Sequence, residues 1–460
     1  MIMKRLMKRI FSILFLSLIV FQVIGQEKLS LKESRALALE YNQKIKIADQ
    51  IIAENQSNVK FAFTHFLPNF SATGSYNYYH DIDDISLSGG FLPTASSEAE
   101  ASLGNYTGIS DVYFPGFNIE MGNIDYHSAS LQVEQPIYMG GKIRTAYAMS
   151  KLGSEISIYN KKLQSSDVLL ETDQAYWNLV SVKEKVTLAK KYVAMLSTLV
   201  QDLQNAFDLE ITTKNELLKA QVQLNQARLN LFRIKNGYVL SKMALCQVIG
   251  RDLMSDIVAV DTIIQVNENT VQTDYMQKAL KNRPELLMQA KQIEISKEQV
   301  KFERAEYLPQ MGVGASYSYM SKINDLIGST KILAVQAKVS VPIFHWQERK
   351  HKLATARFKS KQIELEKDRT EDLISLEVQQ SYFNLQEAFQ QIELAKISMD
   401  QANENVELTK NSFYEGLANT RELLDAQTFW QKAYNELIDS KINYKLSEIK
   451  FLKSTGDLEI

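Results

Sequence analysis

Proline and glycine, the two residues that most damage the interior of a helix, are absent from long stretches of this 460-residue chain. The seven prolines leave residues 137–283 and 343–460 without one, and glycine is missing from 154–236 and from 346–415. Ala, Leu, Glu, Lys and Gln, which favour helices, fill these stretches. At about 1.5 Å per residue, a helix from Gly140 to about Phe207 would be on the order of 100 Å long. We therefore expect long helices that need partners along their length.

Composition excludes several classes of protein. The chain carries 52 Lys and Arg against 54 Asp and Glu, a net charge of −2, so no electrostatic feature predicts nucleic-acid binding. Cys246 is the only cysteine, which excludes a disulfide framework and a multi-cysteine metal site. The five histidines have no metal-ligand spacing, and no nucleophile with a base and an orienting group emerges. We expect no enzyme, no metal and no cofactor.

The N-terminus predicts export. Four basic residues between positions 4 and 9 precede the apolar run 10–20, and small residues end it at Gly25. This order is typical of a signal peptide, here residues 1–25. An uncleaved anchor is the alternative, although the run is short for a membrane span. No cysteine follows the expected cleavage point, so no lipid anchor is expected there.

The chain contains two copies of one unit. Residues 66–78 recur at 307–319, and residues 133–137, 175–179 and 216–221 recur at 339–343, 381–385 and 422–427 with a second constant offset. The offsets differ because the first copy carries an insertion of about 35 residues between Tyr79 and Tyr126. Two copies in constant register indicate a duplication. We predict a first repeat at 26–250, a linker at 251–271, a second repeat at 272–456 and a tail at 457–460.

Each copy contains two segments in which the sequence period is 2 rather than 3.6. Apolar or aromatic residues alternate there with small polar ones, which is typical of strands with two different faces. We predict strands at about 69–79, 126–137, 310–320 and 333–343. Each copy is then helix, strand, strand, long helix, helix. Residues 80–125 are expected to form an external insertion, either an ordered loop or a disordered segment.

The predicted strands are long enough to cross a bilayer when tilted. Aromatic residues suited to a girdle at the membrane interface are Tyr76, Tyr78, Tyr317, Tyr319 and Trp346. Lipid tolerates only closed barrels, and four strands cannot close one. Three chains would supply twelve strands, with the polar face lining a wet lumen. We therefore expect a homotrimer in a lipid membrane.

At this point the chain resembles the TolC-like outer-membrane efflux proteins. The resemblance rests on the tandem repeat, the Leu-Pro entry into each first strand, the exits at 135–141 and 341–344 from each second strand, and the turn at 414–417 that leads to 422–427. It implies a mainly α fold with a β-barrel portion. The trimer would form a 12-stranded outer-membrane barrel continued by a long α-helical periplasmic tunnel. It further implies an exit duct that receives substrates from an inner-membrane transporter and a periplasmic adaptor protein.

The resemblance also implies that the adaptor docks at the turn within each long helical pair. Gly416, Leu417 and Thr420 are the docking candidates in the second copy. The first copy departs from this pattern, with Glu210 in place of the glycine, followed by Ile211 and Thr213. The structural alternative is that Gly416 ends one helix and that Asn419 or Thr420 caps the next.

Acidic residues lie just beyond each turn. They are Glu216 in the first copy and Glu422 with Asp425 in the second, and Lys219 matches Asp425 and could pair with it. Threefold repetition would place like charges around an axis, where they would attract cations. The resemblance assigns these positions to the periplasmic aperture. Solvated helix faces are the alternative.

The alternative function is a periplasmic coiled-coil adaptor or scaffold, which would also be exported and rich in helix. Adaptors carry one helical hairpin between compact β domains, whereas this chain predicts two hairpins. The cargo, whether drug, metal ion, metabolite or protein, has no motif in the sequence.

Overall fold

The computed structural model describes residues 27–261, 274–321 and 328–458. The predicted signal peptide and the end of the predicted linker lie outside these ranges. The described chain divides into two compact units. The helical unit contains residues up to 59, 149–297 and from 357 onward, and the strand unit contains residues 60–148 and 298–356.

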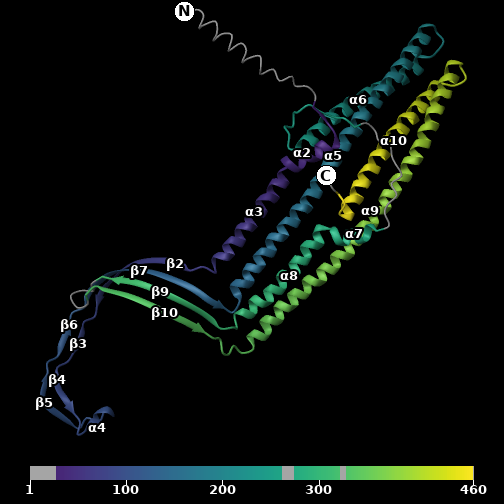
Figure 1. The fold of residues 1–460 in the computed structure, drawn as a ribbon. Helices are drawn as coiled ribbons and strands as arrows, with labels where there is room; N and C mark the ends of the chain where they lie inside the picture. Colours follow the sequence, from purple (N-terminus) through teal and green to yellow (C-terminus); the bar gives the residue numbers. More distant parts are fainter. Residues whose placement is uncertain (1–26, 262–273, 322–327, 459–460) are drawn as a thin grey trace, which may run out of the picture. The chain divides into compact units, whose positions relative to one another are not determined.

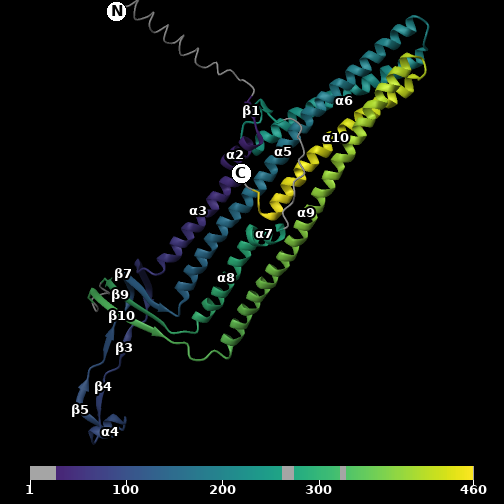
Figure 2. The same ribbon diagram turned by 45° about the vertical axis from the view of Figure 1, so that its right-hand side comes forward.

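The longest elements are two helical hairpins, one in each copy of the repeat (Figure 1, Figure 2). Helix α5 (Lys142–Asp208) pairs with α6 (Lys214–Val248), and α9 (Glu348–Tyr414) pairs with α10 (Thr420–Thr455). Helices α5 and α9 each have 67 residues, as the stretches without proline or glycine predict. None of the helices in the described ranges is both long and apolar enough to cross a membrane.

The shorter helical stretch of each copy is broken at an equivalent position. The first copy has α2 (Leu31–Tyr41) and α3 (Gln43–Thr64), and the second has α7 (Tyr275–Asn282) and α8 (Pro284–Ala305). Asn42 and Arg283 between them are extended, with ψ of 135° and 123°. Pro284 explains the second break, because the residue before a proline disfavours the helical conformation. The sequence predicted one unbroken helix in each copy, so both breaks correct that expectation.

Both break residues bind the last helix of their own copy. The Asn42 side chain donates to the carbonyl of Val248 (2.7 Å), and its oxygen accepts from the Lys44 N–H (2.8 Å). The Arg283 guanidinium donates to the carbonyl of Ser454, the residue equivalent to Val248 (3.2 Å). It also pairs with Glu285 (2.7 Å) and Glu377 (2.9 Å). Each copy therefore ties its short helices to the end of its last helix in the same way.

The core of the helical unit surrounds the middle of α5. Val168, Tyr176 and Leu179 are fully buried there against Leu245 and Ile249. Strand β1 (Glu27–Leu29) pairs in parallel with β8 (Ile257–Ala259), so part of the predicted linker belongs to this packed region. The chain before α2 and the chain after α6 are thereby joined.

Asp173 and Tyr176 inside this core have hydrogen-bond partners, whereas the buried indole N–H of Trp177 has none among the described residues. Asp173, with no exposed surface, accepts hydrogen bonds from Arg35 (2.8 Å from Nε). The Tyr176 hydroxyl donates to Asp261 and also lies 3.1 Å from the carbonyl of Leu29. Burial is the main cause that raises the pKa of Asp173, and it does the same for Tyr176. Satisfied partners make such burial tolerable.

The strand unit holds a four-stranded antiparallel sheet in the order β10-β9-β7-β2. Its strands are β2 (Asn69–Ile82), β7 (Gly122–Met139), β9 (Gln310–Met320) and β10 (Thr330–Ser340). The last was expected at 333–343. It ends three residues earlier, at Ser340.

The register separates the sheet into an apolar and a polar face. Neighbouring rows of one face contain Phe70, Val133, Ala315 and Val335, then Ala72, Leu131, Tyr317 and Leu333. Neighbouring rows of the other contain Asn69, Glu134, Gly314 and Gln336, then Ser71, Gln132, Ser316 and Ala334. Both copies contribute two strands to each row. The alternation predicted from the sequence is therefore continuous across all four strands.

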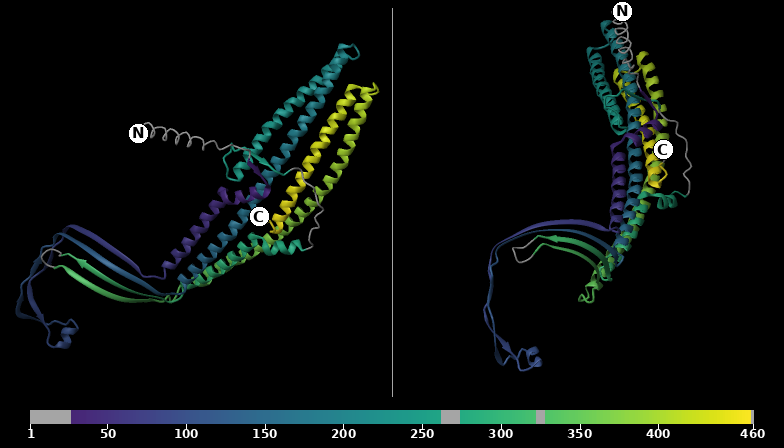
Figure 3. Two further views of the ribbon diagram at one scale, coloured as in Figure 1. Left: turned by 45° about the horizontal axis from the view of Figure 1, so that its top comes forward. Right: turned by 60° about the vertical axis from the view of Figure 1, so that its left-hand side comes forward.

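The insertion of the first copy is an ordered ribbon that extends the β2–β7 pair (Figure 3). Strand β3 (Ile85–Leu87) pairs with β6 (Phe117–Ile119), and β4 (Gly90–Thr94) pairs with β5 (Gly108–Phe114). Helix α4 (Glu98–Ser102) lies between β4 and β5 in the chain. Residues 80–125 contain eight Asp and Glu but no Lys or Arg. The ribbon is thus strongly acidic.

Replacing Arg283 tests the tie at the second break. Arg283→Ala removes both ion pairs and the bond to the Ser454 carbonyl. Because Arg283 is almost fully buried while Glu377 is half exposed, we expect the free energy of unfolding to fall by about 2–3 kcal/mol. Thermal unfolding of the detergent-purified protein, followed by circular dichroism, measures the change. Arg228→Ala on an exposed face of α6 is the control, and an equal midpoint for both variants would contradict the assignment.

Candidate functional site

The two hairpin turns have the same backbone although their sequences differ. Gly416 has a φ of 75°, and Glu210 at the equivalent position has a φ of 56°. The N–H of Leu417 binds the carbonyl of Ser412, and the N–H of Ile211 binds that of Ala206, both at 2.8 Å. A non-glycine residue in this left-handed conformation costs roughly 1–2 kcal/mol. The departure of the first copy from the expected pattern therefore changes the strain and not the turn.

The docking candidates at the turns differ in accessibility. Ile211 and Leu417 are 76% and 79% exposed, and the neighbouring Thr213 is exposed as well. Thr420, in contrast, is buried at the start of α10. The first turn therefore presents two exposed aliphatic side chains, since Leu209 is 70% exposed beside Ile211, and the second turn presents Leu417. Thr420 supports the second turn from inside.

Two of the acidic candidates are held within their own helix ends. Glu216 accepts from Lys219 (2.8 Å), and this bond is the main cause that lowers the pKa of Glu216. Within the described chain Lys219 pairs there, rather than with Asp425 as its position had suggested. Glu422 accepts from the Asn419 N–H while Asn419 accepts from the Glu422 N–H, both at 3.0 Å. Glu422 thus completes a capping box.

Asp425 is exposed in a groove of about 430 Å³ between α9 and α10. Glu422, Leu417 and Phe429 line the same groove. The groove therefore combines two carboxylates with exposed apolar surface next to the turn.

A hydrogen bond that the sequence did not predict joins the two hairpins near their tips. The Tyr414 hydroxyl donates to Asp202 at 2.6 Å, and this bond, with burial, raises the pKa of Tyr414 to about 12. Tyr192 and Thr428 form a second link at 3.2 Å. In the sequence, the position of Tyr414 directly before the turn was the only indication of a link between the hairpins. Its partner lies on another helix, so no local spacing could reveal it.

An apolar cluster supports these links. It contains Leu199 and Leu203 of α5, Leu217 of α6 and Leu423 of α10, all buried. Helices from both copies thus pack together close to the turns. The tips form one joined structure within each chain.

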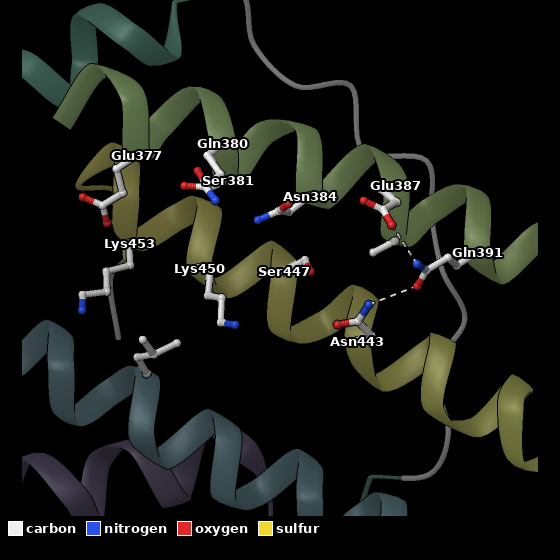
Figure 4. A pocket seen from close by; sticks show the side chains of 12 residues that line it. Glu377, Gln380, Ser381, Asn384, Glu387, Gln391, Asn443, Ser447, Lys450 and Lys453 are labelled. Carbon is white, nitrogen blue, oxygen red and sulfur yellow. Dashed lines mark hydrogen bonds between the residues drawn. The ribbon is translucent and has the colours of Figure 1, made fainter. Parts of the chain in front are cut away.

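A polar pocket of the helical unit carries no catalytic set (Figure 4). It has a volume of about 510 Å³ and is lined mainly by polar residues of α9 and α10. Asn443 donates to Gln391 (3.2 Å), which donates to Glu387 (3.1 Å). None of the described residues that line it is a histidine or cysteine. Across the described ranges, no three His, Cys, Asp or Glu side chains gather as metal ligands.

None of the described residues covers the apolar face of the sheet. Leu131, Leu333 and Val335 on it are 62%, 72% and 78% exposed. Tyr76, Tyr78 and Tyr319 lie toward the end of the sheet that leads to the ribbon, and Tyr317 lies one row farther in than Tyr319. Trp346 follows the opposite end of β10. The five aromatic candidates therefore do not form one band.

Equivalent cap positions in the two copies offer a matched test. Asn419 makes a side-chain cap on α10, whereas Thr213 makes none on α6. Asn419→Ala should therefore lower the free energy of unfolding by about 1 kcal/mol, and Thr213→Ala should lower it by less than about 0.5 kcal/mol. Thermal midpoints of the two detergent-purified variants check this difference. Equal losses would show that the capping box does not stabilise the second tip.

Comparison with known proteins agrees with this geometry. The model of the family described as "Outer membrane efflux protein" matches residues 35–251 and 275–457. The alkaline protease secretion protein AprF of Pseudomonas aeruginosa is 22% identical over 330 residues, which cover 70% of this chain and 67% of AprF.

Solved structures share the fold. The CmeC outer membrane channel of Campylobacter jejuni is 19% identical with a TM-score of 0.71, covering 93% of this chain and 85% of CmeC. The open state of the MtrE outer membrane channel of Neisseria gonorrhoeae is 14% identical with a TM-score of 0.72, covering 93% of this chain and 88% of MtrE. These relatives are channels and not enzymes, and the family match spans both repeats. The chain belongs to the outer membrane efflux protein family.

Proposed function

We propose that three copies of this chain form a channel through the outer membrane and serve as the passive exit duct of an efflux or secretion system. The observation that carries this proposal is the sheet, with one apolar face, one polar face and two free edges. An apolar face of this kind fits lipid, and the polar face fits a water-filled lumen. Residues 1–25 would direct the export that this location requires.

Closure follows from the strand order. The sheet begins with β10 and ends with β2, and these two strands run in opposite directions. The free edge of β10 in one copy can therefore pair with the free edge of β2 in the next in an antiparallel ladder. Such head-to-tail contacts form a ring when the rotation closes. Three copies give twelve strands and leave no free edge in lipid.

The helix tips suit two further roles in this proposal. Ile211 and Leu417 are exposed apolar contacts for a periplasmic adaptor protein, which would connect the duct to an inner-membrane transporter. Glu216, Glu422 and Asp425 would line a periplasmic aperture in the trimer. The Tyr414–Asp202 bond supports a narrow aperture because it holds the second hairpin against the first. A periplasmic scaffold, the alternative function, gains no support from the family match.

Disulfide trapping tests the proposed closure. With Cys246→Ala as background, Thr73→Cys in β2 is combined with a cysteine at Ile332, Ala334 or Gln336 in β10, all on the polar face. Within one chain the two strands are three ladder spacings apart, roughly 14 Å, which is too far for a disulfide. We expect at least one pair to give covalent dimers and trimers in outer-membrane extracts.

The matched control places a cysteine at Ser130 in the central strand β7 with the same β10 partners. This pair should remain monomeric on non-reducing gels. Monomers from every β2–β10 pair would exclude the proposed ring.

Removing the acidic charges tests the aperture. Glu422→Gln with Asp425→Asn keeps an acceptor for the capping box while it removes both carboxylates. In planar bilayers we expect higher single-channel conductance, because the removed carboxylates can no longer form ionic links that would hold the proposed aperture narrow. The preference for K⁺ over Cl⁻ should also fall. Glu404→Gln, on an exposed face of α9, is the control; conductance and selectivity unchanged from the wild type would remove both acids from the aperture.

A further inference from the structure

The two copies make the same reversal between their second strand and their long helix with very different residues. In the first copy Gly140 and Gly141 have φ of 63° and 90°. In the second copy the equivalent residues are Trp346 and Gln347, with φ of 39° and 64°. The first copy uses the residue that adopts this conformation without strain. The second copy keeps two residues that are strained there.

Packing within the chain does not explain the tryptophan. Trp346 is 86% exposed, and its one close ring neighbour, Phe344 at 5.0 Å, is 67% exposed. At Gly140, by contrast, a Cβ atom would lie 2.4 Å from the carbonyl oxygen of Ala305, so only glycine fits. A glycine at 346 would serve the reversal better. The exposed indole therefore points to a partner outside the chain.

Two cations follow the aromatic pair. Arg349 and Lys350 are exposed in the first turn of α9. Nearby carboxylates are engaged elsewhere, since Glu306 binds Lys142 and Lys352 while Glu348 accepts from the Tyr307 hydroxyl (2.8 Å). Within the described ranges, neither Arg349 nor Lys350 forms an ion pair. Their positive charge is free to meet an anion.

The order of these residues along the chain matches the layers of a membrane surface. The apolar rows end at Met311 and Val339, and the aromatic pair comes next, followed by the two cations. Apolar side chains suit the hydrocarbon, aromatic rings suit the headgroup boundary, and basic residues suit anionic headgroups.

We propose that Phe344, Trp346, Arg349 and Lys350 form a binding surface for anionic phospholipid in the leaflet next to the helices. The rings lie against the upper acyl chains, and the cations contact the phosphate groups. This inference rests on the proposed membrane position of the sheet.

Fluorescence quenching by brominated lipids tests the surface directly. Trp177→Phe with Trp430→Phe leaves Trp346 as the sole tryptophan, and the second copy already has phenylalanine, Phe383, at the position equivalent to Trp177. The full-length protein is reconstituted in phosphatidylcholine vesicles that contain brominated phosphatidylglycerol or brominated phosphatidylcholine at equal mole fraction. We expect a relative binding constant about fivefold higher for phosphatidylglycerol, the contribution of roughly one basic residue near a membrane. High salt should reduce this preference.

Charge variants distinguish binding at this surface from general electrostatic attraction between the protein and anionic lipid. Arg349→Gln with Lys350→Gln should abolish the preference, while Arg357→Gln with Lys359→Gln, about 12 Å farther along α9, should retain it. Equal quenching by both lipids in the parent protein would overturn the anionic preference. Absence of quenching by either lipid would overturn the whole surface. The disulfide and conductance experiments do not involve Trp346, so they judge the proposed channel separately.

Trp346→Gly separates lipid binding from a structural role. If the indole serves a lipid, this variant has an equal or higher thermal midpoint in uncharged detergent, because glycine relieves the strain, but it loses the additional stabilisation that phosphatidylglycerol gives the parent protein. A lower midpoint in detergent alone, with lipid stabilisation retained, would assign Trp346 to the fold instead.

Discussion

Unpaired backbone groups at the two edges of the four-stranded sheet are the constraint on which the rest of the structure depends. Each edge strand presents a row of N–H and C=O groups, and the apolar face beside them has no cover within the chain. Water could satisfy the edges but not the face, and lipid could satisfy the face but not the edges. The proposed closure through further copies inside a membrane would satisfy both. The long helices fit the same proposal, because a ring of chains would supply partners along their length.

The duplication explains why one sheet can have an apolar and a polar face across strands from two distant parts of the chain. Both copies contribute strands with the same alternation, and β7 of the first copy pairs directly with β9 of the second. The apolar rows are therefore continuous across the boundary between copies. The helical unit also repeats a contact in both copies. Asn42 donates from an amide and Arg283 from a guanidinium, and both bind equivalent backbone carbonyls. What the duplication preserves is the backbone position of a contact, while the side chain that makes it is free to change.

Features with a local period could be predicted from the sequence, whereas features that depend on distant partners could not. The long helices and the four strands follow from missing breakers and from period 2, and their ends shift by only a few residues. The break at Asn42 could not be foreseen, because no proline follows it and its partner is the distant Val248. Tyr414 and Asp202 are similarly far apart in the chain. The Lys219–Glu216 pair could have been predicted from the sequence, since residues three apart on a helix are neighbours. The ribbon consists of strands of three to seven residues, too short for a periodic signal.

At two positions one copy has glycine and the other copy has a larger residue. Comparing the copies there separates what the backbone requires from what the side chain contributes. At 140 and 416 glycine occupies a left-handed position, and the equivalent residues Trp346 and Glu210 adopt the same conformation under strain. The turn backbone is therefore the same in both copies, although a Cβ atom has room at Gly416 and none at Gly140. A strained residue persists only when the neighbouring structure or a use for the side chain compensates. Neither Trp346 nor Glu210 is buried, so packing within the chain is not that compensation. Both lie instead at the ends of the long helices, where the proposed channel would expose Trp346 to lipid and Glu210 to the periplasm.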